Sequence, residues 1–340
     1  MRYIIIGAGA IGGALGARLA QNSTKHPPLL IARGEHGDTI VRNGLRMRTP
    51  DEDTLVPVDC ASRPAGVVLR DDDVLVLTTK TQDAQTALEQ WVDAPVIDKN
   101  GNRVGTAGTR LPVLTALNGV ESERIALRLY ERVFGVCVWL PAQHLVPGEV
   151  ILRLAPTTGM FIVGRYGTEQ DAADRELLAT IAADWSASSF VVHVVDNVMR
   201  WKYNKLLSNL GNAVQALLGA VDTDGIAIAE RLEAEAESIY RAAGIDWASA
   251  AEESEWRGGV FRIRPVPGVP ADRGGSSCQS LARGRPIESD YLNGEIALLA
   301  RLHGMSAPLN ETVQRLAREA ARAGAGVGSM TAAQLTELLG

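Results

Sequence analysis

The sequence predicts an α/β protein: an N-terminal Rossmann-type doubly wound sheet, followed by an all-helical C-terminal domain. Three observations support this prediction. Short apolar runs alternate with helical stretches over the first half of the chain, which is typical of a parallel sheet covered by helices. A glycine-rich turn directly follows the first of these runs. From about residue 197 onward, apolar residues recur at three- and four-residue steps, the spacing of one helix face.

The strand predictions rest on short runs rich in apolar residues and bounded by turn residues. The continuous apolar run at Val74–Thr78 indicates a strand buried on both faces. With 340 residues, 46% of them hydrophobic, the chain can fill such a core and form two domains. The predicted strands are Tyr3–Ile6, Leu29–Ala32, Arg46–Arg48, Leu55–Val58, Val74–Thr78, Leu111–Leu117, Val133–Leu140, Glu149–Leu154 and Met160–Val163.

The helix predictions divide the chain near residue 195, into a nucleotide-binding domain over 1–194 and a helical substrate and catalytic domain over 195–340. Residues 98–109 are polar and glycine-rich, so we expect an exposed loop. Prolines and glycine pairs break residues 252–275, which we expect to form a long loop, either a lid over the site or a static surface connection. The predicted helices follow the glycine turn to about residue 21 and cover 83–92, 197 to about 217, 224–243, 287–303 and 308–323.

Charge and cysteine content limit the class of protein. The net charge is −6 and no long run of Lys or Arg occurs, which argues against a nucleic-acid partner. Three widely spaced cysteines fit free thiols in a reducing compartment, and the five histidines lack metal-ligand spacing. Without a signal peptide or an apolar span, we expect a soluble cytoplasmic protein with no membrane partner. Apolar faces of the helical domain would either complete its core or form a homodimer.

The strongest local signal is a glycine motif between the first strand and the first helix. In such a motif the first glycine allows a tight turn, the second leaves room for a pyrophosphate, and the third lets helix and strand approach closely. The helix N-terminus then presents unpaired N–H groups to the phosphates. We therefore predict a dinucleotide site at Gly7, Ala8, Gly9, Ala10, Ile11 and Gly12.

The end of the second strand bears on which dinucleotide binds. An acidic side chain there would contact the ribose hydroxyls of NAD, whereas an arginine suits the 2′-phosphate of NADP. Arg33 follows the strand and favours NADP(H), although Glu35 lies close enough to serve a ribose and Arg33 could be merely solvated.

Two further polar residues follow predicted strands at the edge where ligands bind in doubly wound sheets. Lys80 follows Val74–Thr78 and is either a solvated lysine or a contact for a phosphate or carboxylate. Asn118 follows Leu111–Leu117 and belongs either to an ordinary Asn-Gly turn or to a hydrogen-bonding site near the nicotinamide.

The helical domain carries a second group of candidates. Lys205 and Asn209 are four residues apart and share one helix face, with Asn212 close to it. Lys205 is either solvated or, among buried leucines, a proton donor with a lowered pKa. Further along, Ser276 would be a cap or loop residue and Glu288 a favourable first-turn acid, unless both face the site.

Taken together these motifs resemble the ketopantoate reductase family. The resemblance spans nearly the whole chain and keeps the motif order. It implies a Rossmann domain, a helical domain related to that of 6-phosphogluconate dehydrogenase, and an active site in the cleft. The motifs are GAGAIG from Gly7, the Lys80 turn, LNGV from Leu117, WKYNKLLSN from Trp201, and GGSSCQSLARG with IESDYLNG from Gly274 and Ile287.

The resemblance also implies roles. Lys205 would be the general acid that protonates the substrate carbonyl as hydride arrives from NADPH, and Glu288 would hydrogen-bond the substrate. Asn209 and Ser276 would hold its hydroxyl and carboxylate. The remaining implied roles place Asn118 beside the nicotinamide and Arg33 with Lys80 on cofactor or substrate anions.

Some positions depart from the family pattern. Ala213 stands where the family often has a second asparagine, with Asn212 one position earlier, and Ser280 replaces a frequent aspartate. These positions concern the substrate more than the cofactor. The resemblance thus implies an NADPH-dependent reduction of ketopantoate to pantoate, and leaves open a reductase of another small 2-keto acid or a non-catalytic NADP(H) sensor. Keeping both Lys205 and Glu288 argues against the sensor, because binding NADPH needs neither.

Overall fold

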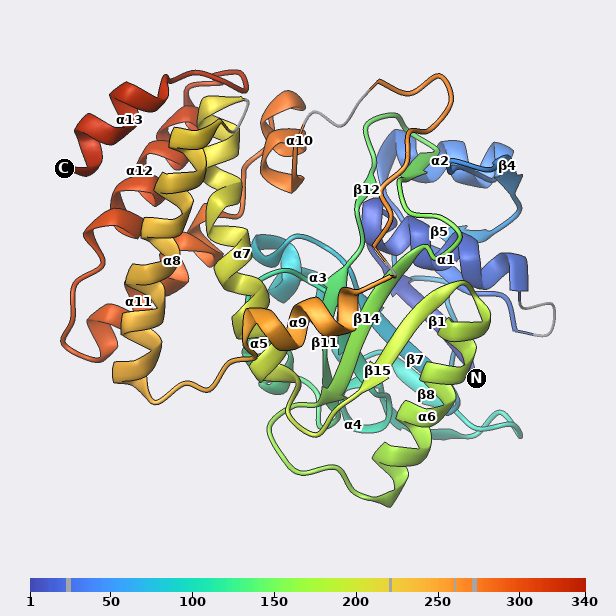
Figure 1. Ribbon diagram of the computed structural model, residues 1–340. Coiled ribbons are helices and arrows are strands. Elements are labelled where there is room, and N and C mark those ends of the chain that lie inside the picture. The colour runs from blue at the N-terminus through green and yellow to red at the C-terminus, as the bar shows by residue number, and fades with distance from the viewer. Residues whose placement is uncertain (23–25, 220–221, 260, 271–273) are drawn as a thin grey trace. The chain divides into compact units, whose positions relative to one another are not determined.

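A computed structural model of the chain describes residues 1–22, 26–219, 222–259, 261–270 and 274–340 (Figure 1). The chain forms two compact units, and neither is continuous in sequence. The first unit comprises Met1–Leu117, Glu121–Met199 and Ala251–Val269. The second comprises Asn118–Val120, Arg200–Ala250 and Pro270–Gly340.

The first unit is built around an eight-stranded sheet in the order β15-β14-β11-β10-β7-β1-β2-β5. Within the described residues every pair in it is parallel except β11 with β14. This confirms the predicted doubly wound fold. Its strands are β1 (Arg2–Ile6), β2 (Leu29–Ile31), β5 (Asp59–Ala61), β7 (Asp73–Leu77), β10 (Val113–Thr115), β11 (Val133–Trp139), β14 (Gly159–Arg165) and β15 (Phe190–Val194).

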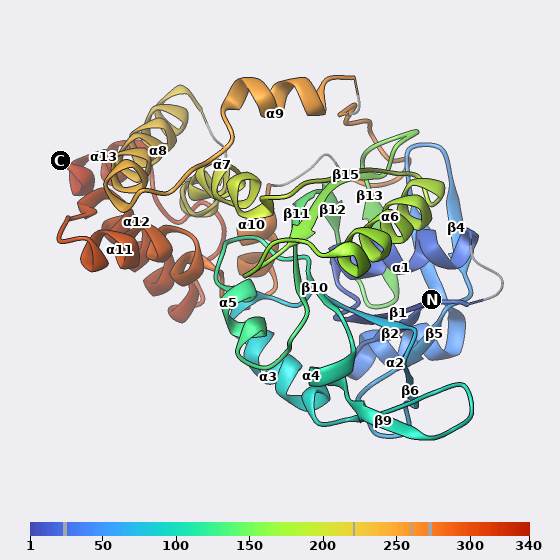
Figure 2. The same ribbon diagram turned by 90° about the horizontal axis from the view of Figure 1, so that it is seen from below.

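Helices cover both faces of this sheet, and each face has its own apolar core (Figure 2). Side chains of α1 (Ala10–Asn22) and α6 (Ala172–Ala187) belong to one core. Side chains of α3 (Thr81–Val92), α4 (Ala107–Arg110) and α5 (Ser122–Leu127) belong to the other. Because the central strands are buried on both faces, they appear in the sequence as continuous apolar runs.

Two small sheets complete the first unit. One has the order β12-β13-β3-β4 and the other β6-β8-β9. The second corrects the loop predicted over residues 98–109, since β8 and β9 pair antiparallel and α4 follows them. The hairpin turn closes where Asp98 accepts hydrogen bonds from the N–H groups of Asn100 and Asn102. The strands are β12 (Ala142–Gln143), β13 (Glu149–Leu152), β3 (Leu45–Arg48), β4 (Asp53–Val56), β6 (Leu69–Arg70), β8 (Pro95–Ile97) and β9 (Arg103–Thr106).

The second unit is helical. Helix α8 (Thr223–Ala243) is capped, as predicted, by Gly244, which adopts a left-handed conformation that glycine takes without strain. The helix predicted over 287–303 instead begins at Asn293, after a short 3₁₀ helix η1 (Ser289–Tyr291). Among the described residues, no helix combines the length and apolar character needed to cross a membrane. The α-helices are α7 (Val198–Leu218), α8 (Thr223–Ala243), α10 (Ser276–Ala282), α11 (Asn293–Leu302), α12 (Pro308–Arg322) and α13 (Ala332–Leu339).

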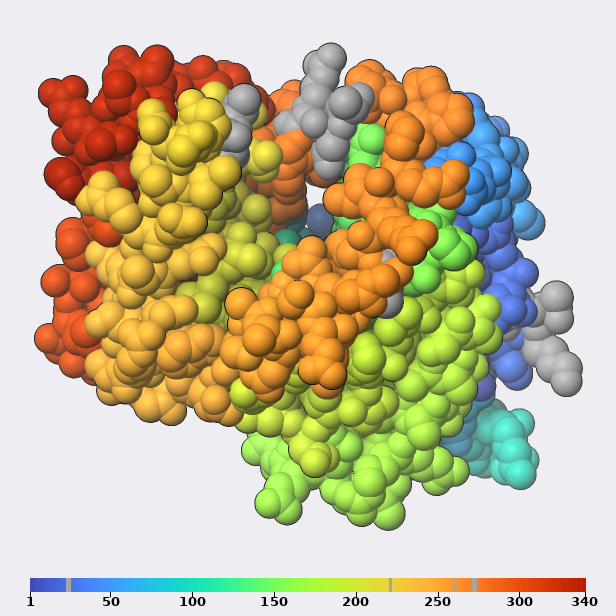
Figure 3. All heavy atoms as spheres, in the orientation of Figure 1, coloured from blue at the N-terminus to red at the C-terminus, as the bar shows by residue number. Residues whose placement is uncertain are grey.

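Residues 251–269 correct a second loop prediction, because the segment begins with helix α9 (Ala250–Arg257) and packs on the first unit (Figure 3). The Trp256 ring stacks on His193 of β15 at 4.3 Å. The Arg257 guanidinium lies 4.3 Å from the ring centre of Trp139 and 4.5 Å from that of Phe261. Residues 260 and 271–273 of the predicted loop lie outside the described residues.

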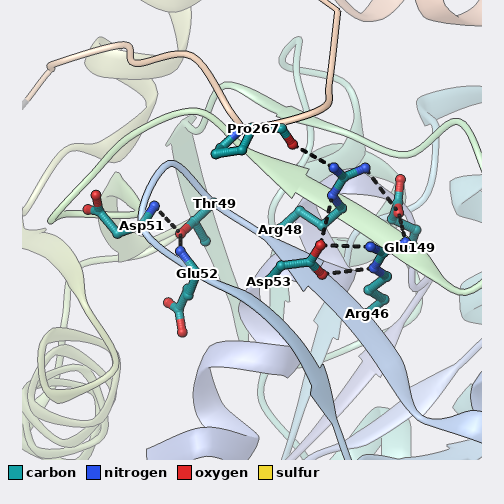
Figure 4. A network of polar contacts seen from close by, with 8 residues as sticks. All are labelled: Arg46, Arg48, Thr49, Asp51, Glu52, Asp53, Glu149 and Pro267. Atoms are coloured by element: carbon teal, nitrogen blue, oxygen red, sulfur yellow. Dashed lines mark hydrogen bonds and ion pairs between the residues drawn. The ribbon is translucent and has the colours of Figure 1, made fainter.

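Polar contacts fix the rest of this segment to the first unit. Arg48 of β3 donates a hydrogen bond of 2.6 Å to the Pro267 carbonyl oxygen (Figure 4). Arg264 pairs with Asp51 at 2.8 Å, and its N–H donates to the Arg153 carbonyl. These contacts join residues more than 100 positions apart in sequence, which is why the local pattern did not predict them.

Candidate active site

The glycine turn lies at the topological switch point of the sheet. Strand β1 pairs with β2 on one side and with β7 on the other, so the loops that follow β1 and β7 meet at one sheet edge. A Cβ at Gly7 would lie 3.1 Å from the Thr79 nitrogen. Gly7 itself has φ +104°, and its N–H donates to the Ile31 carbonyl oxygen.

The second and third glycines of the turn have different surroundings. A Cβ at Gly12 would collide with the Gly7 carbonyl oxygen and the Thr78 hydroxyl, so only glycine lets α1 approach β1 this closely. A Cβ at Gly9 would meet nothing within 4 Å. The open space at Gly9, at the start of α1, fits the pyrophosphate of a dinucleotide.

Thr78 stabilises this turn and was not identified from the sequence. Its hydroxyl donates hydrogen bonds to the carbonyl oxygens of Ile6 and Gly7, and its side chain is buried. A single threonine after an apolar run is too common in sequences to be singled out, so only the structure shows that Thr78 holds the turn through these hydrogen bonds.

Arg33 and Lys80 each lie at the N-cap of a helix that follows a strand of the switch region. Arg33 is exposed and precedes α2 (Gly34–Asn43), a helix that the sequence analysis missed. Glu35 is exposed in its first turn. Lys80 is half-buried and precedes α3, directly after the residues that approach Gly7.

Helix α7 carries the polar face of the second unit. Lys205 is half-buried on it, and Asn209, one turn later, is 4% exposed. Asn212 Nδ2 lies 3.3 Å from Asn209 Oδ1 and donates to it. The buried Asn209 Nδ2 has no hydrogen-bond partner among the described residues. Since a buried amide that lacks a partner is costly, this nitrogen is suited to donate to a ligand.

Other elements of the second unit pack on the same stretch of α7. The N–H of Gly275, which precedes Ser276, donates at 2.8 Å to Gln215 Oε1. Asn293 Nδ2, at the start of α11, donates at 3.2 Å to the Leu210 carbonyl oxygen. The α7 residues between positions 205 and 215 are therefore next to the starts of α10 and α11.

Glu288 and Asn118 belong to the same unit. Glu288 is 4% exposed and precedes η1, so it is not the first-turn acid of a long helix. A Cβ at Gly119 would lie 2.9 Å from the Tyr291 carbonyl oxygen, which brings the Asn118–Val120 segment against η1. Five predicted residues thus fall in the second unit (Asn118, Lys205, Asn209, Ser276 and Glu288), while the glycine turn, Arg33 and Lys80 fall in the first.

Tyr240 of α8 supports α7 rather than acting as an acid. Burial, together with the neighbouring Tyr203 and Glu295, raises its pKa well above the ordinary value for tyrosine. The neutral phenol donates at 3.3 Å to the Tyr203 carbonyl oxygen, two residues before Lys205. It therefore fixes the backbone next to Lys205, and the phenol does not ionise near neutral pH.

Two family models match the chain. A model described as ketopantoate reductase PanE/ApbA covers residues 3–166, and its C-terminal counterpart covers residues 197–321. A 2-dehydropantoate 2-reductase of Mesorhizobium japonicum is 28% identical over 94% of this chain and 98% of its own length.

Solved structures show the same fold. The crystal structure of a PanE/ApbA family ketopantoate reductase from Ralstonia eutropha matches with a TM-score of 0.74 and 26% identity, over 95% of this chain and 99% of that one. The structure of D-mandelate dehydrogenase with NADH and anilino(oxo)acetate matches with a TM-score of 0.75 and 21% identity, over 95% and 99%.

Proposed function

Because the chain belongs to the ketopantoate reductase family, we propose that it reduces 2-dehydropantoate to pantoate with NADPH, a step of pantothenate biosynthesis. The observation that carries the proposal is the polar face of α7. There a half-buried lysine lies one turn from an asparagine whose buried amide nitrogen has no hydrogen-bond partner in the described part of the chain. The curated relatives named 2-dehydropantoate 2-reductase support the choice of substrate.

In the proposed reaction Lys205 acts as the general acid. NADPH, when bound, supplies the hydride that forms the new C–H bond at the keto carbon. The carbonyl π electrons move to oxygen, and Lys205 Nζ donates the proton that completes the hydroxyl group. A cationic donor suits this step because negative charge develops on that oxygen. The resulting neutral amine regains its proton from water.

The other residues of the second unit would hold the substrate. In this proposal Asn209 donates its amide N–H to the substrate and Ser276 donates its hydroxyl, which together fix the hydroxyl and carboxylate groups. Glu288 accepts a hydrogen bond within the same network. Asn118 would lie beside the nicotinamide. Holding a ketone near its reactive geometry lowers the entropic part of the barrier.

The first unit would bind the cofactor. Backbone N–H groups of residues 7–12 would donate to the pyrophosphate at the open side of Gly9, and Lys80 would contribute a cation for it. Arg33 is the proposed contact for the 2′-phosphate, and its exposed N-cap position leaves the guanidinium accessible. In this assignment the first unit serves the cofactor and the second unit serves catalysis, in a cytoplasmic enzyme.

A specific observation favours a second candidate, reduction of a different 2-keto acid. The D-mandelate dehydrogenase structure resembles this chain as closely in fold as the ketopantoate reductase does. Asn212 and Ala213 also depart from the family pattern on the substrate face of α7. A bulkier or aromatic keto acid is therefore the main competitor to ketopantoate.

One assay separates the candidates: oxidation of NADPH in the presence of ketopantoate, pyruvate, 2-ketoisovalerate and benzoylformate in turn. We expect the highest kcat/KM with ketopantoate. A preference for benzoylformate would replace the substrate assignment but keep the reductase. Tight NADPH binding without turnover of any keto acid would overturn the enzyme assignment and indicate a sensor.

A further inference from the structure

A histidine outside the predicted site connects the glycine turn to a distant loop. His36 of α2 places Nε2 2.7 Å from the Ala8 carbonyl oxygen. Its Nδ1 lies 2.8 Å from the backbone nitrogen of Gly148, in the loop between β12 and β13. The sequence separation is 28 residues in the first contact and 112 in the second, so one imidazole joins three distant segments.

The two partners determine which ring nitrogen carries the proton. A backbone N–H can only donate, so Nδ1 must accept the hydrogen bond from Gly148 with its lone pair. A carbonyl oxygen can only accept, so Nε2 must donate to Ala8. Both bonds are satisfied by the neutral Nε2–H tautomer alone. The imidazolium form would lose the Gly148 bond, because both of its nitrogens are donors.

The hydrogen bond from His36 to the Ala8 carbonyl oxygen also orients the Ala8–Gly9 peptide, next to the open space at Gly9. In a trans peptide the C=O of one residue and the N–H of the next point in opposite directions. His36 draws the Ala8 carbonyl toward α2, and the Gly9 N–H therefore points away from α2. A donor so oriented by the protein is ready to bind a phosphate oxygen without reorganisation.

The surroundings of the ring are packed. The His144 ring lies 4.1 Å from that of His36, and its Nδ1 is 3.0 Å from the Glu149 carbonyl oxygen. A Cβ at Gly148 would collide with Thr39 of α2, which shows how closely this loop packs on the helix. Several titratable or charged groups lie on the elements around His36. They are Glu35, Asp38 and Arg42 on α2, Arg33 at its N-cap, Arg46 and Arg48 on β3, Asp59 and Cys60 on β5, and His144 and Glu149 on the β12–β13 segment.

We propose that His36 is a positioning residue for the dinucleotide: its neutral Nε2–H form orients the Ala8–Gly9 peptide, and cofactor affinity falls when His36 is protonated. This inference rests on the proposed cofactor site. It makes α2 and the β12–β13 loop part of the cofactor machinery although neither is assigned a contact with the nicotinamide.

The test compares the parent with His36→Gln, whose side-chain amide can donate to Ala8 and accept from Gly148 but does not titrate. The dissociation constant of NADP⁺, which is stable in acid, is measured between about pH 8 and pH 5.5. Both proteins share any titration of the 2′-phosphate, so the ratio of their Kd values isolates His36. His303→Gln, which changes an exposed histidine of the second unit, is the matched control.

We expect the parent and His36→Gln to bind NADP⁺ about equally near pH 8. Toward pH 5.5 the Kd of the parent divided by the Kd of His36→Gln should rise about five- to tenfold, the scale of one hydrogen bond. His303→Gln should follow the parent. A Kd ratio that stays constant over this range would overturn the proposal. If no variant binds NADP⁺ or NAD⁺ at pH 8, the proposed cofactor fails instead.

A second measurement keeps the two failures distinct. Nitrogen-15 NMR of the imidazole reports the tautomer without any ligand, and we expect the shift of an unprotonated Nδ1 and a protonated Nε2 for His36. An Nδ1–H tautomer at pH 8 would overturn the proposed positioning role even in a protein that binds NADP⁺ well.

Discussion

The two glycines that flank Ala10 and Ile11 satisfy different physical requirements. Gly12 lets α1 pass against β1, whereas Gly9 borders space that no protein atom within 4 Å of its Cβ position fills. A side chain at position 12 would strain the fold, whereas a side chain at position 9 would occupy the space proposed for the cofactor pyrophosphate. Stability and cofactor affinity should therefore respond separately to the two substitutions.

For Gly12→Ala we expect the free energy of unfolding to fall by about 1–3 kcal/mol, as for overpacking in a filled core. Gly9→Ala should leave the melting temperature unchanged and weaken NADPH binding by about tenfold or more, equivalent to about 1.4 kcal/mol. Thermal melts and cofactor titrations check both. Equal effects of the two substitutions on stability would contradict this interpretation of the turn.

Arg33 is the proposed contact that would select NADPH over NADH. We expect Arg33→Ala to weaken NADPH binding by about ten- to a hundredfold, the scale of a hydrogen bond to a charged group, and to leave NADH binding nearly unchanged. Arg42→Ala, which removes an exposed arginine from the last turn of the same helix, controls for the general loss of positive charge. If NADPH binding and NADH binding weaken equally, Arg33 does not contact the 2′-phosphate.

Helix α9 shows why some elements could not be predicted. None of its residues is fully buried, so its sequence has no apolar period to detect. Its contacts include an ion pair of 2.6 Å between Glu253 and Arg257, and the tertiary packing of Trp256 and Arg257 on the first unit. The β8–β9 hairpin was missed for a similar reason. Of the three residues of β8, Val96 alone is fully buried, so the strand has no apolar pattern. By contrast, β1, β7 and α7 have strong apolar patterns, and the sequence predicted them.

The contact between β15 and α9 makes stability depend on pH. Burial lowers the pKa of His193 below its ordinary 6.5, and its buried Nε2 lacks a hydrogen-bond partner among the described residues. The unfolded chain therefore binds a proton at this histidine more readily than the folded one does. The stability it contributes is present above pH 6.5 and declines as the pH falls toward the folded pKa.

When the pH is lowered from about 8 to 5.5, we expect the melting temperature of His193→Gln to fall less than that of the parent, because the variant lacks this titration. All other histidines titrate equally in both proteins and cancel in the comparison. The same fall in melting temperature for both would show that His193 does not carry this dependence.

At the scale of the whole molecule, the alternation of strands and helices was enough to predict the doubly wound sheet and the helical second half. The glycine motif and the order of the family motifs predicted the family, which the comparisons confirm. The assignment of Asn118–Val120 and Ala251–Val269 to their units could not be predicted. Those segments are held by contacts such as Arg48 with Pro267, which are 219 residues apart and leave no local pattern.

The central claim of the proposed function is that Lys205 protonates the carbonyl oxygen of a keto acid that NADPH reduces. The most direct measurement follows deuterium from the C4 position of NADPH into the product, under single-turnover conditions, for the parent and Lys205→Ala. We expect label at C2 of pantoate in the parent, and in the variant a rate about 10²–10⁴-fold lower with NADPH affinity retained. Pantoate without label, or an unchanged rate in Lys205→Ala, would contradict the claim.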